Sequence, residues 1–336
     1  MDSLTHVALG ACLGEILGGR QLGKKALLLG AAAQNLPDID VVCSLWMDPT
    51  SNLLAHRGFT HSFLFSVLVS ALLAWLFQRY SKTECSYRFW SIFFGIQVVT
   101  HCIIDGFNNY GTGWFEPFSH FRVSFHTLYV ADPFFLLPIL IASLFLLTRK
   151  LSHSRKLKIA GIAIALSSLY CAYGVFNKLN VNAVVIEALK NQKIDHNRFF
   201  TTPTPFNTWL WFVVASNNEG HHVGYYSVFD RHDVVDLRFV PRREALLITM
   251  EDSNDVRRLK RFSQSYYTIV QHQDTTIFND LRFGQIAGWY NNQSDFVFHY
   301  YLQPPLDNTL VIQRGRVSTW NKETFTALVR RIRGED

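Results

Sequence analysis

The chain has 336 residues, of which 49% are hydrophobic and only 17% charged, and its formal net charge is +6. A soluble domain carries about 25% charged residues, so the composition argues against a wholly soluble protein and points to the membrane. The basic residues form no nucleic-acid-binding motif, and we expect no nucleic acid among the partners. The length is sufficient for two domains.

The N-terminus, MDSLTHVALG, lacks the basic start of a secretory signal peptide and already carries His6, so no signal peptide is expected. The cysteines show no C-x-x-C spacing, which indicates neither a disulfide framework nor a cysteine zinc site. Buried, inert thiols are predicted instead. The five positions are 12, 43, 85, 102 and 171.

Six helices are predicted before residue 177. Two segments rich in Ala, Gly and Leu, 4–19 and 26–36, are typical of helices packed inside a bundle. A membrane span needs roughly 20 apolar residues, and polar flanking residues can complete shorter runs by snorkelling. Four apolar runs fit this description: 63–77, 89–104, 134–147 and 159–176.

The basic residues between these helices are unevenly distributed. Eleven Lys and Arg lie in the links 18–25, 79–88 and 149–158, whereas the alternate links 37–61 and 106–131 contain only Arg57 and Arg122. Basic links stay on the cytoplasmic side of a membrane. The pattern predicts a multi-pass protein of a bacterial inner membrane. Its N-terminus, its non-basic links and everything after residue 176 face the periplasm.

After residue 177 short aromatic and β-branched runs alternate with breaks rich in Asn, Asp, Gly and Pro, which predicts an antiparallel β-rich domain. Helices are expected at 180–192 and 322–334, and His221 and His222 are expected in a solvated turn beside Gly220. The predicted strands are 208–216, 221–230, 245–251, 266–274, 275–283, 295–302 and 309–317. The predicted fold is thus an α-helical membrane bundle of about six helices (1–176), followed by a soluble β-rich α+β domain (177–336).

Metal-capable side chains gather at the outer helix ends and in the outer links of this topology. They lie in the motifs P-D-I-D (37–40), H-R-G-F-T-H-S (56–62) and H-C-I-I-D (101–105), and at the start of the first helix. Each motif alone also has a structural interpretation, as a helix cap, a packed pair or an interfacial segment. The convergence predicts a shared site made of His6, Asp38, Asp40, His56, His61, His101 and Asp105.

Histidine and carboxylate ligands without cysteine suit zinc, and also manganese or iron. Seven such groups are too many for one closed tetrahedral site and fit a two-metal site with room for water, which predicts metal-assisted hydrolysis, most plausibly of a phosphoester. Arg57 is placed to bind a phosphate oxygen through its planar fork. Thr60 could hydrogen-bond a ligand or the substrate, and a spare carboxylate such as Asp40 could act as the general base. Membrane lipid phosphoesters are the natural substrates at this depth.

These motifs, in this order and threaded through membrane helices, resemble the YdjM-type membrane-bound metal-dependent hydrolases over residues 1–176. That family is similar in turn to zinc-dependent phospholipase C and the S1/P1 nucleases. The resemblance implies an inner-membrane hydrolase with His6, Asp38 or Asp40, His56, His61, His101 and Asp105 as ligands. The soluble enzymes also use an N-terminal amino group and a later H-x-x-x-E pair. Since His6 lies five residues inside this chain and residues 106–176 contain no such pair, one or two ions are expected rather than three.

Two other functions fit the same sequence. A transporter or metal-handling protein could use these ligands to pass an ion, although ionisable residues other than Glu15 are absent from the middle of the predicted spans. A membrane anchor whose β domain binds a partner would need no metal. Metal analysis of purified protein separates the anchor from the other two.

Overall fold

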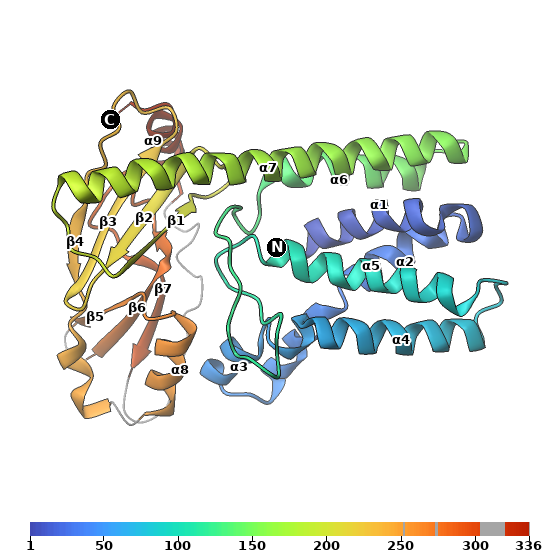
Figure 1. The fold of residues 1–336 in the computed structure, drawn as a ribbon, viewed down its shortest axis with the longest axis horizontal. Coiled ribbons are helices and arrows are strands. Elements are labelled where there is room, and N and C mark those ends of the chain that lie inside the picture. Colours follow the sequence, from blue (N-terminus) through green and yellow to red (C-terminus); the bar gives the residue numbers. More distant parts are fainter. Residues whose placement is uncertain (251–252, 273–274, 303–319, 336) are drawn as a thin grey trace. The chain divides into compact units, whose positions relative to one another are not determined.

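The computed structural model describes residues 1–250, 253–272, 275–302 and 320–335. The chain folds into two compact units, one helical and one rich in β-structure (Figure 1). The predicted boundary at residue 176 lies inside the long helix α7, His153–Asn191, which contributes to both units. The N-terminal unit comprises 1–46, 55–174 and 205–207, and the C-terminal unit comprises 47–54, 175–204 and 208–336.

Helices dominate the N-terminal unit, as the apolar runs predicted, and each of the six runs falls in a helix. Between them lie two short 3-10 helices, η1 and η2, in the link that follows α2. The elements are α1 (Ser3–Leu22), α2 (Lys25–Gln34), η1 (Pro37–Leu45), α3 (Pro49–Ala55), η2 (Phe59–His61), α4 (Phe63–Tyr80), α5 (Tyr87–Asp105), α6 (Pro133–Thr148) and α7.

Three helices in the described part of the chain are long and apolar enough to cross a membrane, namely α4, α5 and α7. The pair α2 and η1 is bent by 56° at its break and could count as a fourth, broken span or as a re-entrant segment. Helix α6 is apolar but shorter. The structure thus supports fewer spans than the six predicted: α2 is too short with 10 residues, and α1 has 20 residues but is not among the apolar candidates. These two helices pack against each other.

Small residues bring α1 and α2 together. A Cβ atom on Gly14 would lie 2.1 Å from the Ala26 carbonyl oxygen, and one on Gly30 would lie 2.2 Å from the Gly10 carbonyl oxygen. Only glycine permits such close approach of two helix backbones. The apolar core of the unit then forms where α1 packs on α6 and α7 through residues such as Leu9, Ile139 and Ala163. All five cysteines are free thiols, and Cys12, Cys102 and Cys171 are buried.

The C-terminal unit contains two antiparallel sheets with strand orders β1-β2-β3-β4 and β5-β6-β7. Short helices α8 (Asn254–Phe262) and α9 (Lys322–Ile332) and the 3-10 helix η3 (Glu244–Met250) accompany them. The strands are β1 (Arg198–Pro203), β2 (Leu210–Ser216), β3 (Gly220–Ser227), β4 (Arg238–Pro241), β5 (Tyr267–His272), β6 (Thr275–Gln285) and β7 (Phe296–Leu302).

Strand β2 is buried on both faces, and its alternating side chains explain how the layers stack. Trp211, Val213 and Ala215 pack against the C-terminal part of α7. Phe212 and Val214 point the other way, into a second cluster that includes Leu281 of β6. Successive strand residues face opposite sides, so this one run covers both cores.

The β-rich domain and the helices at 180–192 and 322–334 are confirmed, but two details of the prediction are wrong. Residues 245–251 belong largely to η3 rather than to a strand. His221 is fully buried in β3 instead of lying in a solvated turn. The helix predicted at 180–192 is continuous with the preceding apolar run in α7. The strand predicted at 309–317 lies outside the described residues.

Candidate metal centre

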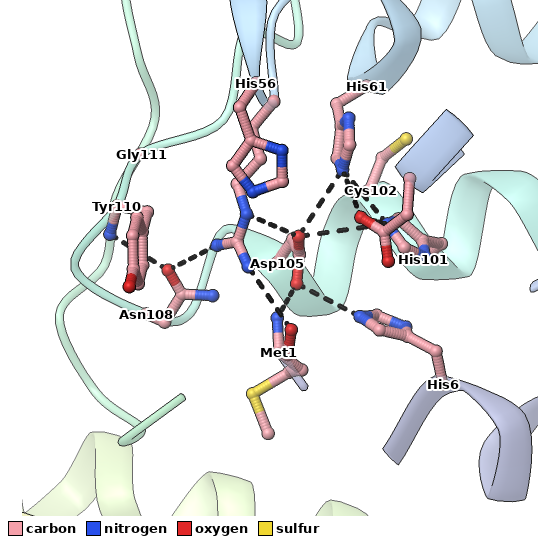
Figure 2. Close-up of polar contacts among 12 residues, drawn as sticks. Met1, His6, His56, His61, His101, Cys102, Asp105, Asn108, Tyr110 and Gly111 are labelled. Carbon is pink, nitrogen blue, oxygen red and sulfur yellow. Dashed lines mark hydrogen bonds and ion pairs between the residues drawn. The ribbon is translucent and has the colours of Figure 1, made fainter. Parts of the chain in front are cut away.

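Four predicted ligands meet at one end of the N-terminal unit. Asp38 comes from η1, His61 from the end of η2, and His101 and Asp105 from the last turn of α5. One ligand atom from each lies within 4.8 Å of every other. We refer to these four residues as the four-ligand cluster, of which Figure 2 labels His61, His101 and Asp105. His61, His101 and Asp105 have no exposed side-chain surface, and Asp38 is 19% exposed.

Hydrogen bonds fix the two histidine rings with one nitrogen toward the cluster. The His101 Nδ1–H donates to the backbone oxygen of Gln34 at 2.5 Å. The His61 Nδ1–H points to Asp40 Oδ2 at 3.3 Å, a carboxylate–histidine arrangement that orients metal-binding histidines. Both Nε2 atoms then carry lone pairs, yet they lie 3.1 Å apart. A cation between them would relieve this repulsion.

The remaining distances fit the same interpretation. His61 Nε2 lies 3.4 Å from Asp38 Oδ1 and 3.6 Å from Asp105 Oδ2, and His101 Nε2 lies 3.6 and 3.8 Å from the same two oxygens. A tetrahedral zinc ion with bonds of 2.0–2.1 Å has ligands roughly 3.3 Å apart. The cluster therefore has the donor types and the spacing of a divalent metal site.

Asp40 lies behind His61 rather than in the cluster. Its carboxylate is 2% exposed and accepts hydrogen bonds from the Arg57 backbone N–H at 2.8 Å and the Thr60 hydroxyl at 2.9 Å. The His56 Nδ1–H donates to its other oxygen at 2.9 Å. With all these donors in place, Asp40 holds His61 and the H-R-G-F-T-H-S segment in position.

Arg57 lies next to Asp105 and forms a buried ion pair with it. Its Nε lies 3.1 Å from Asp105 Oδ2, and its side chain also donates to Asn108 Oδ1 at 2.8 Å and to the Met1 carbonyl oxygen at 3.3 Å. The backbone of Arg57 adopts a left-handed conformation, with φ of 58°, which costs a non-glycine residue roughly 1–2 kcal/mol. The buried ion pair and the hydrogen bonds on both sides of the residue hold it there.

Two further groups contact Asp105 Oδ1. His6 Nε2 lies 3.2 Å from it, and the His6 ring stacks on His101 with 3.8 Å between the ring centres. The α-amino group of Met1 pairs with the same oxygen and is fully buried. Burial lowers the pKa of this amino group well below its usual value. The Nδ1 atom of His6 has no hydrogen-bond partner among the described residues.

The structure thus divides the predicted residues into three groups. Asp38, His61, His101 and Asp105 form the cluster; His6 contacts it directly; and Asp40, His56, Arg57 and Thr60 surround it. His56 is 32% exposed, and its burial lowers its pKa more than the hydrogen bond to Asp40 raises it. The prediction did not include Met1, Asn108 or the Gln34 carbonyl group. No local motif marks them, and only the fold brings them to the site.

Apolar helices long enough to cross a membrane, joined to a buried His and Asp cluster, define an integral membrane protein with a candidate metal centre. The model of the YdjM inner membrane protein family matches residues 1–181, and the chain belongs to this family. The resemblance to the YdjM family is therefore confirmed.

Two curated relatives share this part of the chain. Inner membrane protein YbcI of Escherichia coli K12 is 31% identical over 121 residues, which are 35% of this chain and 69% of YbcI. The uncharacterized protein YfhP of Bacillus subtilis 168 is 34% identical over 146 residues, 40% of this chain and 42% of YfhP. The match thus spans less than half the length of YfhP. No solved structure matches the chain significantly.

Proposed function

We propose that this protein is a membrane-bound metal-dependent hydrolase that acts on lipid or other membrane-proximal phosphoesters. The observation that carries the proposal is the four-ligand cluster, in which two oriented imidazoles and two carboxylates lie within 4.8 Å of one another. Asp38, His61, His101 and Asp105 would hold one ion, and His6, which contacts Asp105, is the further histidine beside them if a second ion binds. Zinc suits these donors best, with manganese or iron as alternatives.

A bound divalent cation polarises a phosphoryl oxygen and makes a water molecule more acidic. The protein's own residues supply the rest. Arg57 places a fixed positive charge beside Asp105, which favours an anionic phosphoester at the site. Asp38 is the cluster carboxylate with exposed surface, so it is better placed than Asp40 to accept a proton from water. Asp40 and Thr60 keep the His61 ring oriented.

The orientation of the protein in the inner membrane belongs to the proposal as well. The basic links favour a site and a C-terminal unit that face the periplasm. His61 lies just before α4, Asp105 ends α5 and His6 lies in the first turns of α1, so the ligands occupy helix ends rather than helix centres. A site at this depth meets phosphoesters near the headgroup layer.

Elemental analysis of the full-length protein in detergent tests the proposal. Wild type should retain about one or two zinc-type ions per chain. A variant with His101→Ala and Asp105→Ala should lose them, together with any phosphoesterase activity in a substrate screen. His120→Ala is the matched control, because His120 is 64% exposed and pairs with Glu116 outside the cluster. Equal metal content in all three proteins, with no activity, would support the anchor function instead.

A second candidate function, ion transport or metal handling, is favoured by Glu15. This residue of α1 is fully buried, and neither carboxylate oxygen has a hydrogen-bond partner in the described structure. The nearest basic side chains are His153, whose Nδ1 lies 3.7 Å from Oε1, and Lys156, whose Nζ lies 3.9 Å from Oε2. Metal uptake into proteoliposomes, lost in Glu15→Gln but retained in His120→Ala, would favour this function over hydrolysis.

A further inference from the structure

The segment η1 has two different faces. Its acidic residues turn toward the site: Asp40 is 3% exposed, and Asp38 belongs to the four-ligand cluster. Its apolar residues turn outward, with Val41 57% and Leu45 80% exposed, and Trp46, which directly follows η1, is 66% exposed. The same nine-residue element thus carries metal-site carboxylates on one side and an exposed apolar surface on the other.

A second apolar surface belongs to the loop between α5 and α6. Phe118 is 84% exposed and Phe121 is 67% exposed in this loop. Thr112 and Val123 pair as an isolated antiparallel bridge at the base of the loop. The loop is tied to the metal-site segment, because the Gly113 N–H donates to the Arg57 carbonyl oxygen at 2.8 Å. These phenylalanines are therefore held next to the site.

We call these exposed side chains the apolar rim. Its members come from η1, from the H-R-G-F-T-H-S segment and from the α5–α6 loop, all within the N-terminal unit. They are Ile39, Val41, Val42, Leu45, Trp46, Phe59, Phe115, Phe118 and Phe121. Exposed apolar side chains gathered on neighbouring segments mark an interaction surface, and aromatic residues are enriched at the boundary between a membrane and water.

The rim continues the lipid-facing surface of the bundle. Helix α4 begins two residues after His61, and its side chains Val67 and Leu68 are 65% and 55% exposed along a candidate span. The solvent-exposed part of the cluster also lies beside the apolar rim. Asp38 alone of the four ligands is exposed, and its neighbour Ile39 is 54% exposed. A ligand that reaches Asp38 therefore passes an apolar surface.

We infer that the apolar rim lies in the adjacent membrane leaflet and that the site takes lipid phosphoesters directly from it. The acyl chains stay against the rim while the phosphate group reaches the cluster past Asp38. The substrate part of this inference rests on the proposed function, and the position of the rim in the leaflet does not. A water-soluble phosphoester would gain nothing from the rim.

The position of the rim is tested without any activity. Full-length protein is reconstituted into vesicles with lipids brominated on the acyl chains, and the Trp46 signal is taken as the difference between wild type and Trp46→Phe. Trp46 fluorescence should be quenched by the brominated lipids and protected from aqueous iodide. Trp75, which is 53% exposed on α4, is the control for contact with lipid. Quenching by iodide alone would overturn the inference, and protection from both quenchers would indicate a protein partner or second copy instead.

The substrate class is tested with a rim variant, Leu45→Ser with Trp46→Ser and Phe118→Ser. Its kcat/KM for long-chain phosphatidate in vesicles should fall roughly tenfold or more, since burial of each large side chain contributes to lipid binding. Hydrolysis of water-soluble p-nitrophenyl phosphate and the metal content should stay at wild-type values, which also shows that the variant folds. An equal loss for both substrates would refute the lipid specificity. A wild type that hydrolyses neither would refute the proposed function, while Trp46 quenching would still decide the position of the rim.

Discussion

Both units bury ionised groups, but they assemble them in different ways. In the C-terminal unit Asp280 and Arg282 lie two residues apart on β6, and both are fully buried. Arg282 donates to both carboxylate oxygens, at 3.1 and 2.6 Å, so one strand supplies both charges. In the N-terminal unit the cluster draws its residues from η1, η2 and α5, which are far apart in the sequence.

The difference separates a structural pair from a functional site. In the C-terminal unit the two opposite charges pair with each other on one strand, and replacement of such a buried pair by apolar residues is often neutral. The cluster collects more lone pairs than its own donors can satisfy, with two imidazole nitrogens 3.1 Å apart. Such a donor set could hold a cation, and without one its desolvation is costly.

The largest effect is expected when one ligand of the four-ligand cluster is removed, which tests whether this cluster is a functional site. We expect His61→Ala to weaken metal affinity by more than roughly 100-fold, because loss of outer-shell partners alone costs 10–100-fold. Phosphoesterase activity should fall to background. Metal titration of the purified full-length protein after chelation measures the affinity, with His120→Ala as the control. Unchanged affinity in His61→Ala would remove this residue from the site.

The next largest effect concerns the structural pair. Asp280→Ala leaves Arg282 buried without its partner and should destabilise the C-terminal unit by about 3–5 kcal/mol. Asp280→Leu combined with Arg282→Met should recover most of that loss, since no charge is then buried. Urea unfolding of the full-length protein measures both variants. Metal content should not change in the double variant, and a loss of metal there would contradict the separation between the two kinds of buried charge.

The sequence predicted the helices and the convergence of the site because both follow from patterns along the chain. Apolar runs define helices, and the alternation of basic links brings His6, His101 and the histidines of the outer link to one face. It could not distinguish Asp38 from Asp40. These residues are two apart on a 3-10 helix with three residues per turn, so they point in different directions, and only the packing of η1 decides which one joins the cluster.

The errors in the β-rich unit have a related cause. The sequence predicts a solvated turn beside Gly220, but Gly220 begins β3, where a Cβ atom would lie 2.4 Å from the Val240 carbonyl oxygen of the neighbouring strand. His221 is consequently buried in a sheet. Its Nε2–H donates to the Tyr267 carbonyl oxygen at 2.7 Å, and its Nδ1 contacts the Ser216 hydroxyl at 2.6 Å. Tertiary contacts of this kind leave no mark on the local sequence.

His221 also allows the comparison to be tested with pH. Burial, with smaller effects from Arg242, Arg198 and His222, lowers its pKa from 6.5 to about 4. Above pH 6.5 the ring is neutral whether the unit is folded or unfolded. As the pH falls toward 4, only the unfolded chain takes up the proton, so the free energy of unfolding should decrease by about 3 kcal/mol.

Hydrogen exchange of β2 and β5 peptides in the full-length protein, at pH 7 and pH 4.5, measures this loss. His221→Gln keeps a polar side chain but cannot titrate, and it should show a flatter pH dependence. An equally steep dependence in the variant would assign the effect to other groups, such as the carboxylates of the unit.

The smallest effect is expected from substitution of Thr60, which tests whether this residue supports the metal site or contacts the substrate. Its hydroxyl donates to Asp40 Oδ2 at 2.9 Å and lies 3.1 Å from His61 Nδ1, so it holds a ligand from behind. We expect Thr60→Val to weaken metal affinity about tenfold, the lower end of the range for such partners, and Thr60→Ser to restore it. Metal titration and kinetics on the same samples distinguish the two roles. If Thr60→Val keeps wild-type metal affinity but has a lower kcat, Thr60 acts on the substrate. It would then no longer count among the residues that only support the cluster.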